Sequence, residues 1–146
     1  MYTPLRALAA LCLTCAFAAP ACANDRMSLH PIQRAIDNAT AAGKLDGSVK
    51  FFIVDAPPDA VVVQADTVTN RKTSAVFKSD EAACDWAAQS ALISLQDAAK
   101  KAGANAVVNV VSFYKKRVRE DRVNYECHAG AAVAGVALRG DLAVVK

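Results

Sequence analysis

The side chains best suited to chemistry lie close together near the C-terminal end of the chain. Glu126 and His128 are two positions apart, which places them on one face of an extended strand, where a carboxylate and an imidazole could act in acid–base catalysis or bind a metal. A Cys127–His128 nucleophile is not expected, because neighbours on a strand point to opposite faces. Zinc needs at least three protein ligands, and the only other histidine, His30, lies near the expected start of the exported chain, where we expect no ordered ligand. We predict no catalytic and no metal site, and keep a metal-binding or hydrolytic protein using Glu126 and His128 as an alternative.

A cluster of five cations is the densest group of charges in the chain: Lys115, Lys116, Arg117, Arg119 and Arg122. Such a cluster could bind nucleic acid or another polyanion, with neighbouring aromatic rings as stacking partners. Glu120 and Asp121 interrupt the cluster, and cations also protect the exposed edges of sheets. We therefore interpret residues 115–122 as the solvated tip of a hairpin, and keep polyanion binding there as an alternative.

Nucleotide-binding and hydrolase motifs are absent from the sequence. The pair Gly43-Lys44 lacks both the upstream glycine and the following hydroxyl residue of a phosphate-binding loop. There is also no G-x-S-x-G nucleophile elbow. We expect no nucleotide, no cofactor and no enzymatic activity.

The first 23 residues have the pattern of a secretory signal peptide. Arg6 precedes an apolar stretch, residues 7–19, and small residues at Ala21 and Ala23 flank Cys22. The apolar stretch is shorter than the ~20 residues that span a bilayer. Acylation of Cys22 is a lesser alternative, since residue 19 is Ala where lipoprotein signals usually have a branched apolar residue. We predict cleavage after Ala23, a periplasmic or secreted protein, and no stable membrane insertion after cleavage.

Cleavage would leave two of the five cysteines, Cys84 and Cys127. Two cysteines in an oxidising compartment predict one disulfide, which the chain-entropy argument values at about 4 kcal/mol. The alternative is a pair of reactive or metal-binding thiols, but no C-x-x-C spacing supports it.

Composition indicates one folded domain, residues 24–146. The full chain has 146 residues, 54% of them apolar, which excludes a disordered polyelectrolyte and a multidomain enzyme. The first 23 residues hold one cation and no acid, so the net charge falls from +3 to +2 without them. That balance gives no general electrostatic reason to bind nucleic acid or anionic lipid.

The first half of this domain is predicted to contain a helix and a hairpin. Ser28 could cap a short helix, with Pro31 in its first turn and Gly43 at its end. Residues 49–54 and 60–65 are rich in β-branched and aromatic residues and flank a proline turn, which predicts a hairpin. Residues 69–74 are polar and are predicted to form a loop.

A long helix is predicted next, from the N-cap Ser79 to Gly103. Asp80 and Glu81 would interact favourably with the positive end of the helix dipole. Small and apolar residues recur on one face: Cys84, Ala87, Ala88, Ala91, Leu92, Leu95, Ala98, Ala99 and Ala102. Trp86 lies on a flank, where we expect it to pack against the domain.

The last third is predicted to be mostly strand. Residues 106–114 form one strand, and residues 123–128 form another with Val123, Tyr125 and Cys127 on one face, so that Cys127 can approach Cys84. Residues 129–138 favour a continued strand, with a short helix as the alternative, and Gly140-Asp141 predicts a turn before a last strand at 142–145. The fold class is α+β: one long helix packed on a mostly antiparallel sheet of about four to five strands, joined by one helix-to-strand disulfide.

Two resemblances accompany these patterns. Residues 103–108, Cys127 and residues 129–132 resemble the periplasmic domain of the Rcs stress-sensor lipoprotein. Nearly all of residues 24–146 is similar to a family of small exported proteobacterial proteins that often carry the label excinuclease ATPase subunit. The similarity lies in residues 47–51, 69–73, 78–81, 84–86 and 125–130. The second resemblance implies a small exported protein. Because no nucleotide motif is present, it implies no ATPase activity for this chain.

Together these patterns predict an exported, non-enzymatic binding or envelope-associated protein. Its partner is not encoded in any motif, and an envelope protein is one candidate. A binding module should expose a groove or a sheet edge that lacks clustered titratable groups.

Overall fold

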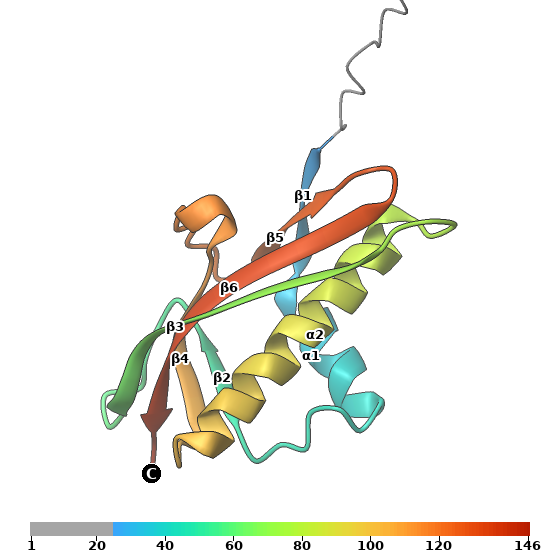
Figure 1. Cartoon of the computed structure of the whole chain (residues 1–146). Helices are drawn as coiled ribbons and strands as arrows, with labels where there is room; N and C mark the ends of the chain where they lie inside the picture. Colours follow the sequence, from blue (N-terminus) through green and yellow to red (C-terminus); the bar gives the residue numbers. More distant parts are fainter. Residues whose placement is uncertain (1–24) are drawn as a thin grey trace, which may run out of the picture.

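The computed structural model describes residues 25–146, which form an α+β fold of two helices and one curled, mixed sheet (Figure 1). The predicted signal peptide, residues 1–23, lies outside the described residues. The elements in chain order are β1 (Arg26–Pro31), α1 (Ile32–Ala41), β2 (Lys50–Ile53), β3 (Val61–Ser74), α2 (Asp80–Lys101), β4 (Ala106–Ser112), the 3-10 turn η1 (Tyr114–Lys116), β5 (Asn124–Ala129) and β6 (Val133–Val144). The predicted fold class is confirmed, with six strands in place of four to five.

The long helix α2 forms where the capping signals predict it. Ser79 Oγ accepts a hydrogen bond from the backbone N–H of Ala82 at 3.1 Å, and Asp80 and Glu81 occupy the first turn. Lys100 and Lys101 occupy the last turn. The buried face of the helix is mostly alanine, cysteine and leucine, so α2 can lie close to the sheet.

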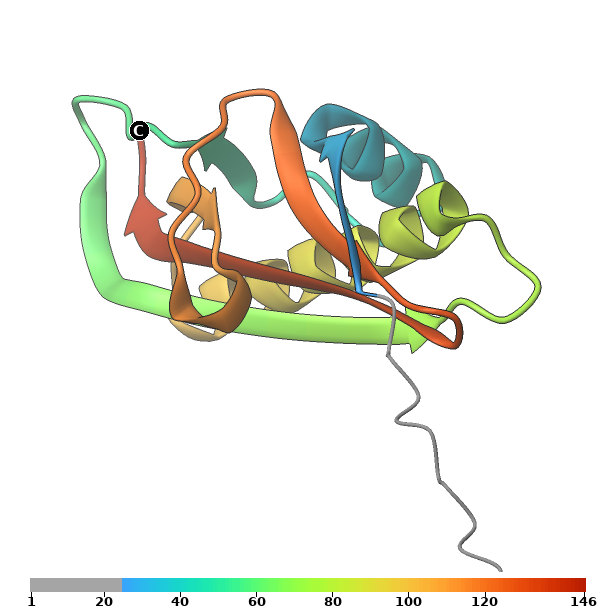
Figure 2. The ribbon, with the colours of Figure 1, turned by 90° about the horizontal axis from the view of Figure 1, so that it is seen from above.

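Strand β6 is the centre of the sheet, because three strands pair with it. On one side it pairs with β3 from Val61 opposite Val144 to Ser74 opposite Val133, with two register shifts between Val62 and Thr67. On its other side, β5 pairs with the first part of β6 and β4 with the second part. β1 extends the sheet beyond β5, and β2 extends it beyond β4. Both helices pack on one face, as the view from above shows (Figure 2).

The predicted hairpin of residues 49–54 and 60–65 is wrong. β2 instead lies parallel to β4, and β3 pairs antiparallel with β6. The predicted loop at 69–74 is also wrong, because β3 continues to Ser74 and buries Thr69. The composition of these residues indicates extended backbone, but strand partners are set by contacts far away in sequence.

The predicted start of the first helix is wrong as well. Residues 26–31 form β1, which pairs with β5, and α1 begins at Ile32 with no side-chain cap. Ser28 therefore caps nothing and instead lies opposite Cys127 in the sheet. The open edge of β5 gives this short segment a partner that local sequence does not reveal.

The predicted turn at Gly140-Asp141 is absent, because β6 runs through both residues. A Cβ atom at Gly140 would lie 2.7 Å from Val107 Cγ1, so this position requires glycine for close packing between strands. Residues 129–138 do not form a helix, but the predicted continued strand is wrong: β5 ends at Ala129, the chain turns, and β6 begins at Val133 and pairs antiparallel with β5.

The core lies between α2 and the sheet, and its largest fully buried side chains include Tyr125, Leu92, Leu95, Leu138 and Leu142. Trp86 does not join it: its side chain is 57% exposed, so the expectation that it anchors the packing is wrong. Within residues 25–146, no helix has the length and apolar character needed to cross a membrane.

Candidate functional site

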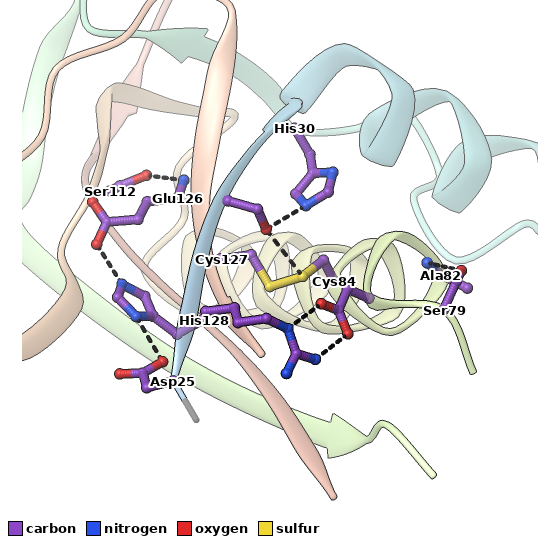
Figure 3. The surroundings of a disulfide bond; sticks show 12 residues. Asp25, His30, Ser79, Ala82, Cys84, Ser112, Glu126, Cys127 and His128 are labelled. Carbon is purple, nitrogen blue, oxygen red and sulfur yellow. Dashed lines mark hydrogen bonds and ion pairs between the residues drawn. A yellow bond between two sulfur atoms is a disulfide. The ribbon is translucent and has the colours of Figure 1, made fainter. Parts of the chain in front are cut away.

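The disulfide between Cys84 and Cys127 joins α2 to β5, as predicted (Figure 3). Both cysteines are completely buried. A thiolate acting as a nucleophile, or a bridge exchanging with other thiols, must be reached from solvent. The geometry therefore assigns this bridge a structural role.

A Ser28–His30 pair from β1 lies beside the disulfide. His30 Nε2 is 2.8 Å from Ser28 Oγ, which is 4.0 Å from Cys84 Sγ. Burial, followed by the charge of Arg34, lowers the pKa of His30 below its usual 6.5. The expectation that His30 is not part of an ordered site is wrong, because β1 fixes its position. Within residues 25–146 no carboxylate hydrogen-bonds its other ring nitrogen, so the pair lacks the orienting group of a serine-nucleophile site.

A second cluster, from β5, η1 and the residue before β1, lies on the opposite face of the sheet. His128 Nε2 is 2.6 Å from Glu126 Oε1, which confirms that these residues share one strand face. His128 Nδ1 is 2.9 Å from Asp25 Oδ1 (Figure 3). The Tyr114 ring stacks on the imidazole with centroids 3.4 Å apart, and its hydroxyl donates to Asp25 Oδ2 at 3.2 Å. The predicted Glu126–His128 pair is thus part of a larger unit that includes Asp25 and Tyr114.

In the arrangement observed, neither ring nitrogen of His128 is free to exchange a proton with a substrate. Each ring nitrogen of His128 is engaged by a carboxylate, and the His128 side chain is only 11% exposed. Burial acts to raise the pKa of Asp25, but the hydrogen bond and charge of His128 outweigh it, and that pKa is lowered. Burial, then the Asp25 charge, raises the pKa of Tyr114. Within the part of the chain that the structure describes, no three His, Cys, Asp or Glu side chains converge on a metal position.

The cationic segment 115–122 is not a hairpin tip. β4 and β5 each pair with β6 and not with each other, and the segment folds back on the end of β4 through the Ser112–Arg119 bridge. Arg122 forms an ion pair with Asp55. In the described residues no carboxylate forms an ion pair with Lys115, Lys116, Arg117 or Arg119, although Lys115 Nζ lies 5.3 Å from the Tyr114 ring centroid.

A groove of about 280 Å³ lies between α1 and β2. Its apolar lining includes Ile36, Leu45 and Phe51, and its polar lining includes Gln33 and Lys50. None of the residues that line it is His, Cys, Asp or Glu, although Lys50 and Thr40 are side chains of types that can act as a base or a nucleophile.

The longest open feature is the outer edge of β3. This 14-residue strand pairs only with β6 among the described strands, whereas the other two outer strands have 6 and 4 residues. Large side chains are exposed along it, at Val61, Val62, Val63 and Val68. Sequence reasoning missed this edge because it assigned part of β3 to a hairpin and part to a loop. The β-branched run at 61–63 was the signal available.

No family model matches this chain, and comparison with curated proteins and with solved structures found no significant similarity.

Proposed function

We propose that this chain is an exported, non-enzymatic binding domain of the cell envelope, and that it binds its partner through the outer edge of β3. The long open edge of this strand is the observation that carries the proposal. Unpaired N–H and C=O groups on such an edge can pair with a strand of another protein, and exposed side chains on both faces can add specificity. The titratable side chains of β3 are Asp66 and the adjacent cations Arg71 and Lys72.

The hydrogen bonding and burial of the histidine and cysteine side chains support a non-enzymatic role. His128 is engaged at both nitrogens by Asp25 and Glu126. The cysteines are buried in a bridge. The α1–β2 groove is lined by no His, Cys, Asp or Glu.

Export is supported by two independent features. The disulfide requires an oxidising compartment to persist, and residues 1–23 have the charge and hydropathy pattern of a signal peptide. We propose a periplasmic or secreted location after cleavage near Ala23.

The β3 edge is tested by capture from an envelope extract with purified, exported protein. Val62→Lys with Val68→Lys places two charges on the edge, and natural proteins use such charges to prevent strand addition. Val123→Lys is the matched control, since Val123 is also exposed but lies just before β5. We expect wild type and Val123→Lys to retain the same protein, and the β3 variant to lose it. Equal retention by all three proteins would contradict edge binding.

Polyanion binding through the cationic segment is the second candidate, because four exposed cations there form no ion pair with a carboxylate among the described residues. A triple variant with Lys115→Ser, Lys116→Ser and Arg117→Ser tests it on immobilised heparin. Salt-dependent retention of the wild type that the variant loses would support this function. A wild type that elutes without added salt would exclude it.

A further inference from the structure

The loop between β3 and α2 exposes an aromatic side chain in an unfavourable backbone conformation. Lys78 N donates to Ala75 O at 3.1 Å and closes a turn in which Phe77 occupies the third position with φ 59°. Glycine is the preferred residue at that position of such a turn. Phe77 is nonetheless there, and its side chain is fully exposed. A strained backbone that presents an apolar ring to water costs stability, which points to a function for the ring.

The turn is held firmly on both sides. Ala75 is buried, and its N–H donates to Ala132 O at 2.9 Å, which ties the loop to the turn between β5 and β6. On the other side, Ser79 caps α2. Phe77 therefore projects from a fixed base and is not part of a loose loop.

Further exposed apolar residues lie at the same end of the molecule as Phe77. Val76 is 46% exposed, and Val133, at the start of β6, is opposite Ser74 at the end of β3. The turn between β5 and β6 adds exposed alanines. We call this surface the apolar tip, and it consists of Val76, Phe77, Ala131, Ala132 and Val133.

The described chain begins at the same end. Arg26 lies opposite Ala129 in the β1–β5 pair, and Ala129 directly precedes the β5–β6 turn. The N-terminal end of β1 is therefore near the apolar tip in both ribbon views (Figures 1 and 2). The preceding sequence holds the apolar stretch 7–19, which is predicted to engage the membrane during export. While the signal peptide is still attached, the end of the domain where Phe77 projects is therefore the end joined to the segment that engages the membrane.

We propose that the apolar tip docks this domain on a lipid bilayer, with Phe77 inserted among the headgroups. Phe77 has the highest exposed fraction among the exposed large apolar residues of the described chain, and a projecting apolar ring suits a fluid surface that needs no complementary pocket. The five tip residues include no charge, and the adjacent Arg26 is neutralised by Asp80 at 2.8 Å. Lys78 lies next to Phe77; its ammonium donates to Ser74 O at 3.3 Å and would exchange this bond for a lipid phosphate on docking. This inference rests on the proposed export and is independent of partner binding at β3, whose Val61 end lies away from the tip (Figure 1).

Flotation of the purified, exported protein with vesicles of phosphatidylethanolamine and phosphatidylglycerol tests the proposal. We expect the wild type to float with the vesicles in about 1 M salt, where the screening length is only about 3 Å and an attachment through apolar side chains persists. Phe77→Gly should weaken binding roughly 10- to 100-fold. Glycine adopts a φ of 59° without strain, so this variant should melt no lower than the wild type, and its loss of binding cannot come from unfolding.

Two valines with equal exposure provide the matched control. Val76, in the tip, and Val118, in the cationic segment, are each 46% exposed. Val76→Ser should weaken flotation, and Val118→Ser should leave it unchanged. A wild type that stays with the soluble fraction would overturn the proposal, as would equal flotation of Phe77→Gly. Concentration-dependent dimers lost in Phe77→Gly, without flotation, would assign the tip to a second copy of the chain. The variant Val62→Lys with Val68→Lys should float like the wild type, so the outcome at the tip and the outcome at β3 are separate.

Discussion

Opening the Cys84–Cys127 bridge should remove a large part of the stability of this domain. The two cysteines are 43 positions apart, so the bridge closes a loop of 44 residues in the unfolded chain. The chain-entropy relation, −2.1 − 1.5R ln n, gives about −13 cal/mol/K for this loop, or about 4 kcal/mol at 25 °C. Domains are stable by only ~5–15 kcal/mol, so the reduced protein should be marginal.

Urea unfolding followed by circular dichroism measures this difference. The oxidised and the reduced wild type have the same side chains in the core, so their comparison isolates the bridge. A double variant, Cys84→Ala with Cys127→Ala, should lose somewhat more, because both sulfurs are buried and their removal leaves space. A difference below about 1 kcal/mol between the oxidised and reduced proteins would refute the reasoning.

The rate at which a reductant reaches the buried sulfurs provides a second assay for the same bridge. Since neither cysteine is exposed, a reductant can reach the sulfurs only when the surrounding structure opens. Reduction without denaturant should therefore be slow and should accelerate with urea in parallel with unfolding. Mass measurement of the exported protein with and without reductant should differ by two hydrogens. Two free thiols in the native protein, or fast reduction without denaturant, would contradict a buried bridge.

Three further outcomes follow from individual positions. Gly140→Ala should destabilise the domain by about 1–3 kcal/mol, because the new Cβ would lie 2.7 Å from Val107 Cγ1. Gly135→Ala is the control: its Cβ would meet nothing closer than 3.5 Å, so it should destabilise the domain far less. The urea concentrations at the unfolding midpoints of the two variants measure this difference. Because folding lowers the pKa of His30, the imidazole binds a proton more tightly in the unfolded chain than in the folded one. The free energy of unfolding should therefore be highest above about pH 6.5 and should decrease as the pH falls from there through the pKa of His30 in the folded protein. His30→Gln should flatten that part of the stability–pH curve and leave the carboxylate region below about pH 4 unchanged. Phe77→Gly should leave the melting temperature unchanged or raise it. Glycine removes the strain of the left-handed backbone conformation, worth about 1–2 kcal/mol, and this gain opposes the greater freedom of glycine in the unfolded chain. A clear fall in melting temperature would refute strain at this turn.

The features that local sequence determines were predicted well. The helix α2 has its N-cap at Ser79, carboxylates in its first turn and a small-residue stripe, all of which act within a few residues. The small-residue stripe of α2 and the alternation of β5 also predicted that Cys84 and Cys127 lie on facing surfaces, and the structure joins them in a disulfide.

The features that depend on distant contacts were not predictable in this way. β1 pairs with β5 and β2 with β4 across long separations in sequence, and neither local pattern specifies its partner. Gly140 resembled a turn residue, because a glycine required for close strand packing and one required for a turn look alike in sequence.

The same division applies to the candidate sites. The period of a strand placed Glu126 and His128 on one face, but Asp25 lies 103 positions from His128 and entered the cluster only through the β1–β5 pairing. Phe77 is conspicuous only when its positive φ and complete exposure are known. Neither property follows from its residue type.

Amide hydrogen exchange on the domain, with and without the protein it retains from the envelope, tests the central claim most directly. If a partner strand adds to β3, the outward-facing amides of Val61–Ser74 should exchange more slowly in the complex, while amides in residues 115–122 should be unchanged. Protection confined to residues 115–122 or to the α1–β2 groove, with β3 exchanging as in the free protein, would contradict binding at this edge.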